Sequence, residues 1–135
     1  MFLNVTNHPT DGDLPWSTKQ RQAAEAIGGQ VYDFQFPDVP PDASSADVVA
    51  LADTLAERIV EMNPTAALVQ GEFTLTVALV AQLERRGIPC YAATARRIAS
   101  LTGNRDVSVE TSEFRFVQFR RYALSSVERL GSLRD

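Results

Sequence analysis

Strand-and-helix units follow one another along this chain, and that alternation is the feature that most constrains its fold. Each unit begins with an apolar, β-prone run and continues with a segment of helical character. The strands are expected over residues 2–7, 30–36, 66–70 and 88–93, and the helices over residues 17–28, 45–62 and 75–86. Alternation of this kind predicts a mostly parallel sheet with helices packed against it.

The ends of these segments carry signals of their own. Ser17, followed three residues later by Gln20, has the form of a helix capping box. Ser44 or Ser45 begins the second helix, whose apolar residues recur at helical spacing. The run 66–70 is almost continuously apolar, as expected of a parallel strand buried on both faces.

The alternation stops after Thr94. The remaining segments are expected to be a short helix, a turn and two extended segments, over residues 96–101, 103–106, 107–110 and 114–120. The last segment has an irregular pattern, because Phe116 falls on one face of a regular strand and Phe119 on the other. Either both faces of this strand are partly covered, or the strand contains a bulge.

A chain of 135 residues is long enough for one domain with its own core. We therefore expect residues 1–135 to form a single α/β domain, a Rossmann-like three-layer sandwich with a mostly parallel sheet. Residues 100–123 are expected to form a C-terminal β-hairpin or ribbon.

Composition excludes several classes of protein. The single cysteine, Cys90, rules out an internal disulfide or a multi-cysteine metal site. With one histidine and scattered acids, we expect no metal and no other cofactor. No apolar run approaches membrane-spanning length, and Met1 leads into a strand without a basic leader. We therefore expect a cytoplasmic protein with no membrane contact.

Charge is distributed unevenly along the chain. Residues 1–84 hold three basic residues against twelve acids, whereas residues 85–135 hold ten arginines against five acids. Arginine favours planar recognition of phosphate or carboxylate. The alternative is that the two parts pair with each other, within one chain or in an oligomer. The net charge of −4 argues against binding to duplex nucleic acid.

Polar side chains gather where the expected strands end. Ligands of parallel α/β sheets bind beyond the carboxyl ends of the strands, so these side chains are candidates for a site. The candidate catalytic residues are His8, Glu72 and Arg96. The candidate ligand-binding residues are Thr6, Asn7, Trp16, Gln70, Gly71, Phe73, Thr74, Thr94 and Arg97. His8 is the only histidine, and histidine is the side chain that ordinarily titrates near neutral pH.

Each of these candidates has a structural alternative. His8 can simply cap a loop. Glu72 can be a favourable charge at a helix start, and Trp16 can staple the first helix to the body. Gly71 opens a turn whose backbone N–H groups would suit a phosphate. The nucleotide-binding glycine motifs and the serine-hydrolase elbow are absent from the sequence.

Two short motifs carry a resemblance to a known family. One is Leu-Asn-Val-Thr-Asn-His at residues 3–8, followed by a loop and Trp-Ser-x-x-Gln at residues 16–20. The other is residues 69–76, a glycine- and threonine-containing turn between strand and helix, although Glu72 stands in it and no lysine follows. The sequence resembles small stand-alone CRISPR-associated proteins of the ring nuclease type, which are related to the CARF (CRISPR-associated Rossmann fold) sensors.

This resemblance implies a metal-independent enzyme that binds and cleaves cyclic oligoadenylate, with cyclic tetra-adenylate as the first candidate. It implies that His8 is the acid or base and that Arg96 or Arg97 stabilises the phosphate. Ring symmetry suits a C2 homodimer. Three alternatives stay open: a sensor or sponge that binds without cleaving, a nucleoside-processing enzyme such as a deoxyribosyltransferase with Glu72 as nucleophile, and a regulatory subunit whose ribbon docks a partner.

Overall fold

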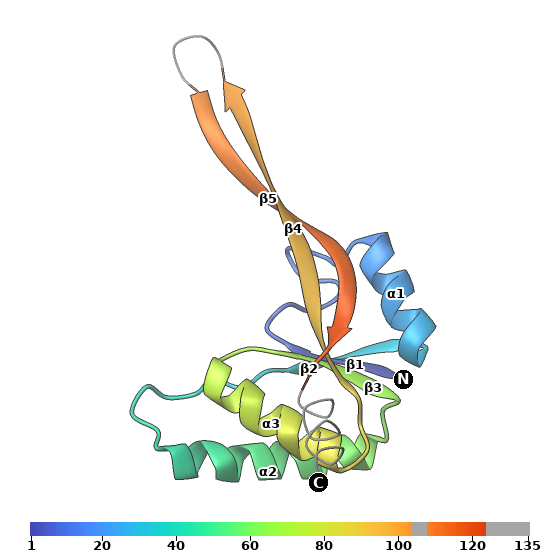
Figure 1. The fold of residues 1–135 in the computed structure, drawn as a ribbon, viewed down its shortest axis with the longest axis vertical. Helices are drawn as coiled ribbons and strands as arrows, with labels where there is room; N and C mark the ends of the chain where they lie inside the picture. Colours follow the sequence, from blue (N-terminus) through green and yellow to red (C-terminus); the bar gives the residue numbers. More distant parts are fainter. Residues whose placement is uncertain (104–107, 124–135) are drawn as a thin grey trace, which may run out of the picture.

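A five-stranded sheet organises the molecule (Figure 1). The computed structural model describes residues 1–103 and 108–123. For residues 100–103 and 108–112 it describes the backbone only. The strands are β1 (Phe2–Thr6), β2 (Val31–Gln35), β3 (Ala66–Gln70), β4 (Cys90–Gly103) and β5 (Ser108–Arg121). They lie in the order β2-β1-β3-β4-β5, and every neighbouring pair is parallel except β4 and β5. The mixed α/β class and the mostly parallel sheet are confirmed.

Helices cover both faces of the parallel strands (Figure 1). The helices are α1 (Thr18–Gly28), α2 (Ser45–Met62) and α3 (Phe73–Arg85). Helix α1 lies on one face, and α2 and α3 lie together on the other. Ser17 accepts a hydrogen bond from the Gln20 N–H, which confirms the serine half of the predicted capping box. Ser44 caps α2 and forms a full capping box with Asp47. Helix α3 begins two residues earlier than expected, because Glu72 caps it.

Alternating side chains of the strands fill two separate cores. Leu3 and Val5 belong to the core under α2 and α3, whereas Phe2 belongs to the core under α1. Asn4 and Thr6 alternate with these apolar residues and are also buried. On the α1 face, β1 therefore changes from apolar at its start to polar at its end, toward the loop that follows it.

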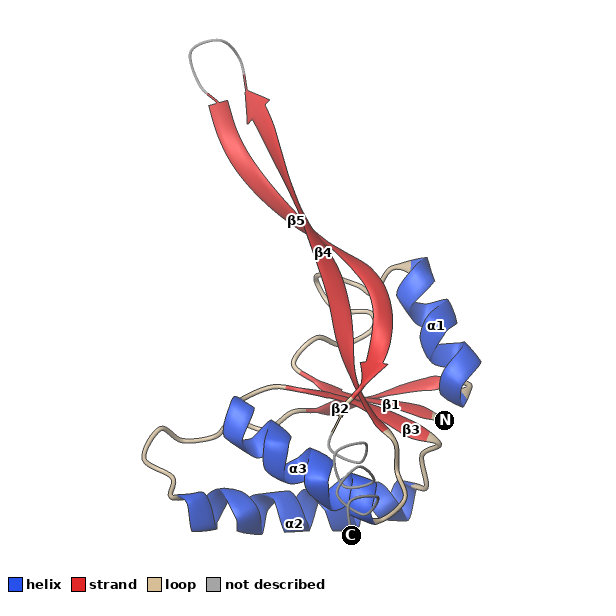
Figure 2. Cartoon of the chain, viewed as in Figure 1, coloured by secondary structure: helices blue, strands red, loops and turns tan. Residues whose placement is uncertain are grey.

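Strand β4 is longer than the sequence indicated. The prediction of a short helix over residues 96–101 is wrong, because each of these residues pairs with β5 in an antiparallel ladder. β4 pairs with β3 only at Cys90 and Tyr91, and beyond that point it leaves the sheet with β5 as a projecting two-stranded ribbon (Figure 2). Of the predicted turn, residues 104–106 lie outside the described residues.

The irregular pattern of the last strand is explained by a bulge. Thr94 faces Gln118 and Ala95 faces Phe116, so Val117 is the extra residue of β5. The bulge brings Phe116 and Phe119 to the same face, where their ring centroids lie 4.8 Å apart. No helix in the described part of the chain is long and apolar enough to cross a membrane.

Candidate functional site

A cleft of about 1250 Å³ lies at the carboxyl ends of β1 and β3. From β1 the chain passes to β2 on one side, and from β3 it passes to β4 on the other, so the cleft is at the topological switch point of the sheet. Three regions line it: the ends of β1 and β3, the loop between β1 and α1 with the start of α1, and the ribbon of β4 and β5. Ligand sites of open α/β sheets form at this position.

The cleft opens because β3 and β4 separate. Beyond the pair Leu68 and Tyr91, side chains replace the backbone ladder between these two strands. The Gln70 amide oxygen accepts a hydrogen bond from the Ala93 N–H at 2.9 Å, and the Tyr122 hydroxyl donates to the Val69 carbonyl at 2.6 Å. Gln70, predicted as a ligand-binding residue, lines the cleft and also bridges this gap.

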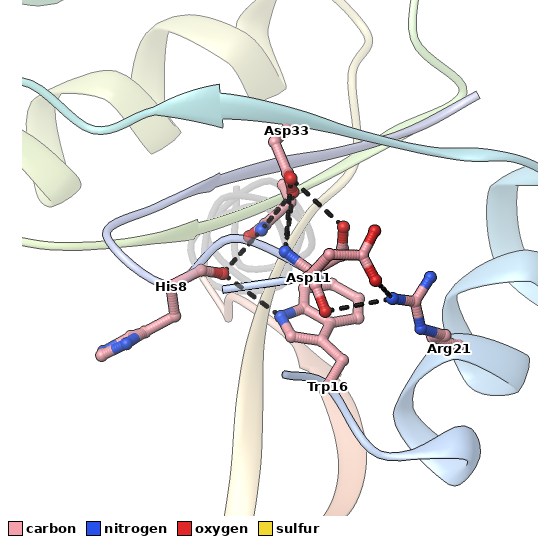
Figure 3. Close-up of polar contacts among 7 residues, drawn as sticks. His8, Asp11, Trp16, Arg21 and Asp33 are labelled. Atoms are coloured by element: carbon pink, nitrogen blue, oxygen red, sulfur yellow. Dashed lines mark hydrogen bonds and ion pairs between the residues drawn. The ribbon is translucent and has the colours of Figure 1, made fainter. Parts of the chain in front are cut away.

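His8 lines the cleft, and buried groups hold its backbone (Figure 3). Its carbonyl accepts hydrogen bonds from Asn4 Nδ2 at 2.9 Å and from Trp16 Nε1 at 3.3 Å. Its N–H donates to the Thr6 hydroxyl at 3.0 Å. The imidazole itself points away from this network. The structure therefore fixes the backbone of His8 and leaves its side chain exposed at the cleft.

Asp33 of β2 anchors the same network from the neighbouring strand (Figure 3). Its carboxylate accepts from Asn4 Nδ2 at 2.9 Å, and from the Thr10 N–H and hydroxyl, each at 3.1 Å. The Thr10 carbonyl in turn accepts from Arg21, which also pairs with Asp11. The loop between β1 and α1 is thus tied at both ends.

Asn4, Thr10 and Asp33 support the site but were not predicted from the sequence. Asn4 was visible as a polar residue inside an apolar strand, and only 1% of it is exposed. A buried amide needs partners, so this position signals a hydrogen-bonded network. Its partner Asp33 lies 29 residues away in sequence, and only the parallel register of β1 and β2 brings the two together.

Trp16 serves mainly as a structural residue. Only 8% of it is exposed, and its ring packs against Phe119 with centroids 6.0 Å apart. It precedes the cap of α1, so its packing fits the staple alternative. Part of its surface nevertheless lines the cleft, together with Thr6 and Asn7. Asn7 is exposed and accepts a hydrogen bond from Gln35 at 2.7 Å.

The turn at Glu72 lies beside the cleft and does not line it beyond Gly71. The Glu72 carboxylate caps α3, accepting from the N–H groups of Thr74 at 3.0 Å and Leu75 at 2.9 Å. The Thr74 hydroxyl donates to it at 2.6 Å, and these bonds lower the pKa of Glu72 below its ordinary value. Phe73 is 86% exposed on the outer side of the helix start.

Gly71 has a packing role that differs from phosphate binding. A Cβ at this position would lie 2.4 Å from the Phe36 ring, so a larger residue would force that ring to move. The Gly71 N–H donates to the Thr76 hydroxyl at 3.1 Å. Because the N–H groups of Gly71, Thr74 and Leu75 all have partners within the protein, this turn offers a phosphate few donors.

The ribbon separates the arginines that sequence analysis grouped. Arg96 lines the cleft, but its neighbour Arg97 does not, as expected from the alternation of side chains along a strand. Thr94 lies at the bulge, where its hydroxyl donates to the Gln118 carbonyl at 3.0 Å and accepts from the Gln118 N–H at 3.2 Å.

The cleft is also lined by residues that were not predicted as site residues, among them Lys19, Glu113, Phe114 and Arg115. The last three lie on β5, and their place depends on the register of the ribbon, which no local pattern determines. Among the side chains that the structure describes, no group of three or more histidine, cysteine, aspartate or glutamate residues is arranged to hold a metal ion.

The fold and the cleft define the class: an α/β protein whose sheet has a cleft at its topological switch point, lined in part by cationic side chains. The chain belongs to the family described as "Uncharacterized protein MJ1673", whose model matches residues 1–120. That match includes every residue that lines the cleft. Searches of the curated proteins and of the solved structures gave no match.

Proposed function

We propose that this protein binds cyclic oligoadenylate in the cleft and cleaves it without a metal ion. The first candidate ligand is cyclic tetra-adenylate. The observation that carries the proposal is His8, whose backbone is fixed by buried groups at the switch point while its imidazole stays exposed. The proposal is supported by the rule that Rossmann-like sheets bind ligands beyond the carboxyl ends of their strands, with the ribbon here as an additional wall of the cleft.

The size and charge of the cleft suit a nucleotide larger than one unit. Pockets for drug-sized ligands occupy roughly 300–1,000 Å³, and this cleft has about 1250 Å³. Lys19, Arg96 and Arg115 supply cationic groups against one carboxylate, Glu113. Phe114 is 71% exposed at the cleft, and exposed aromatic side chains stack on nucleobases.

The proposed reaction is transesterification within the ring. The ribose 2′-oxygen attacks the adjacent phosphorus, and the bond from phosphorus to the 5′-oxygen breaks. One proton leaves the 2′-hydroxyl and one reaches the 5′-oxygen, so the products are a 2′,3′-cyclic phosphate and a 5′-hydroxyl. His8 performs one of these proton transfers and water the other, while Arg96 stabilises charge on the phosphate.

The second candidate is a protein that binds cyclic oligoadenylate without cleaving it. The capping role of Glu72 favours this binding-only candidate. Because Glu72 caps α3 and does not line the cleft, it is not available to His8 as a partner for proton transfer. The same observation weakens the deoxyribosyltransferase alternative, since a nucleophile needs a carboxylate free to reach the substrate. In either candidate, a C2 pair of chains would match the symmetry of the ring.

The test is incubation of the purified protein with cyclic tetra-adenylate and cyclic hexa-adenylate in EDTA. We expect linear products that end in a 2′,3′-cyclic phosphate, and their loss in His8→Ala. Gln22→Ala is the control, because Gln22 is exposed on α1 and does not line the cleft. Tight binding without products would favour the second candidate. If the protein shows no binding and forms no products, both candidates are refuted.

A further inference from the structure

Two arginines face each other directly across the ribbon. Arg96 of β4 and Arg115 of β5 are partners in the antiparallel ladder, and both line the cleft. Directly opposed residues of such a ladder have Cβ atoms about 4.5–5.5 Å apart and share one face of the sheet. Like charges at these positions are destabilising. This arrangement has a cost in the free protein, so it calls for an explanation.

Among the described side chains, nearby carboxylates do not neutralise the two guanidinium groups. Glu113 pairs with Arg115 at 3.4 Å, but both side chains are more than 60% exposed. An exposed ion pair of this kind contributes little. The ladder pairs on either side of the two arginines are Ala95 with Phe116 and Arg97 with Phe114, which add no negative charge. The pair therefore presents excess positive charge to the cleft.

We propose that Arg96 and Arg115 together form a phosphate-binding site, with one phosphate or phosphodiester held between the two guanidinium groups. Each guanidinium is a planar fork that can donate two parallel hydrogen bonds to phosphate oxygens. Two forks on one face of a ladder can converge on the same phosphate, whose negative charge removes their repulsion. Arg115 then becomes a ligand-binding residue alongside Arg96, supplied by the second strand of the ribbon.

This inference rests on the proposed function only for the location of the ligand. It requires a phosphodiester in the cleft, but neither a cyclic ligand nor cleavage. A phosphate site at this pair has a further consequence, which a purely structural role of the two arginines would not have. Repulsion between Arg96 and Arg115 destabilises the free protein, although the ligand needs both residues. Removing either charge should stabilise the free protein and weaken binding at the same time.

The experiment measures thermal unfolding and equilibrium binding of linear tetra-deoxyadenylate, which lacks the 2′-hydroxyl and so cannot be cleaved by the proposed reaction. The proteins are the unmodified chain, Arg96→Gln, Arg115→Gln and the control Arg120→Gln, which removes an arginine of β5 that faces Ala92. The measurements are made at low ionic strength, where repulsion between exposed charges is least screened.

We expect Arg96→Gln and Arg115→Gln each to weaken binding by about tenfold or more, to raise the melting temperature of the free protein, and to reduce the shift that the ligand causes. Arg120→Gln should bind like the unmodified chain. Arg115→Lys keeps the charge that repels Arg96 but loses the planar guanidinium group. This variant should therefore bind the ligand more weakly without becoming more stable.

The inference is overturned if the unmodified chain does not bind this ligand, if Arg120→Gln weakens binding as much as the other two, or if both cleft variants melt lower than the unmodified chain. Phosphodiester binding through the pair, without cleavage of the cyclic ligand, would refute the nuclease proposal and leave this inference standing.

Discussion

Asn4 Nδ2 lies 2.9 Å from the carbonyl oxygen of His8 and 2.9 Å from Asp33 Oδ1, so one buried amide joins the end of β1 to β2. The Asn4 amide oxygen accepts in turn from the Thr6 hydroxyl at 2.8 Å. All of the side chain's main hydrogen-bonding groups are therefore satisfied inside the protein. Asn4 does not line the cleft, but it holds the backbone of the exposed His8 through this hydrogen bond.

Replacing Asn4 by alanine should lower stability by about 1–3 kcal/mol, because it leaves buried hydrogen-bonding groups without a partner. Asn7→Ala is the control: Asn7 is exposed and its change should stay within roughly 0.5 kcal/mol. Urea unfolding followed by the fluorescence of Trp16, the single tryptophan, measures both. Equal stability of the two variants would show that the network does not support the fold.

Replacing Gly71 by alanine tests its packing against Phe36. The added methyl group would lie 2.4 Å from the Phe36 ring, so we expect a loss of about 1–3 kcal/mol from overpacking. The double variant Gly71→Ala with Phe36→Leu should lose less than the sum of its two single variants, because leucine vacates part of the space. Strict additivity in urea unfolding would mean that the two residues do not compete for this space.

The alternation of strands and helices was predictable because it depends on local patterns. Ser17 and Ser44 mark helix starts, and the apolar run before Gly71 marks a buried strand. The sequence of residues 96–101 carries no β-pattern and predicts a helix, and only pairing with β5 makes these residues a strand. Tertiary pairing overrides local propensity in such a segment.

The candidate site was predictable only at the strand ends. His8 and Gln70 follow from the rule that parallel sheets bind ligands at their carboxyl edge. Arg115 does not follow from any such rule, since its position opposite Arg96 depends on the bulge at Val117. From the sequence, Glu72 could be either a site residue or a favourable charge at a helix start. Its hydrogen bonds from the N–H groups of Thr74 and Leu75 show that it caps α3.

The cap at Glu72 predicts a specific dependence on pH. Hydrogen bonds from the Thr74 side chain first, and then from the backbone of Thr74 and Leu75, lower the folded-state pKa of Glu72 below its ordinary 4.5. A lowered folded-state pKa means that the charged form stabilises the fold above pH 4.5 and that this stability is lost as the pH falls through the lowered pKa.

Glu72→Gln should therefore melt below the unmodified chain at neutral pH and converge with it in acid, where Glu72 is itself uncharged. Melting temperatures of the two proteins across the acid range measure this convergence. A difference that persists unchanged to the lowest pH would mean that the charge of Glu72 does not contribute to the cap.

Cys90 should be unreactive in the folded protein. Burial raises the pKa of its thiol to about 12, with the nearby Glu84 carboxylate adding to the effect and Arg121 opposing it. The thiolate is the reactive form, so a disulfide reagent near pH 8 should modify Cys90 only as fast as the protein opens. The same reagent with urea-unfolded protein is the control. Immediate modification of the folded protein would contradict the buried placement of this thiol.

If His8 belongs to the ligand site of the cleft, a bound ligand will shift the nuclear magnetic resonance signals of its imidazole. His8 is the only histidine, so its imidazole proton signals need no assignment. The protein is titrated with the 2′-deoxy form of cyclic tetra-adenylate, which the proposed reaction cannot cleave. We predict a saturable shift of the His8 signals with the same midpoint as binding measured calorimetrically. Signals that stay unmoved while the ligand saturates the protein would show that the ligand binds elsewhere and that His8 is not part of its site.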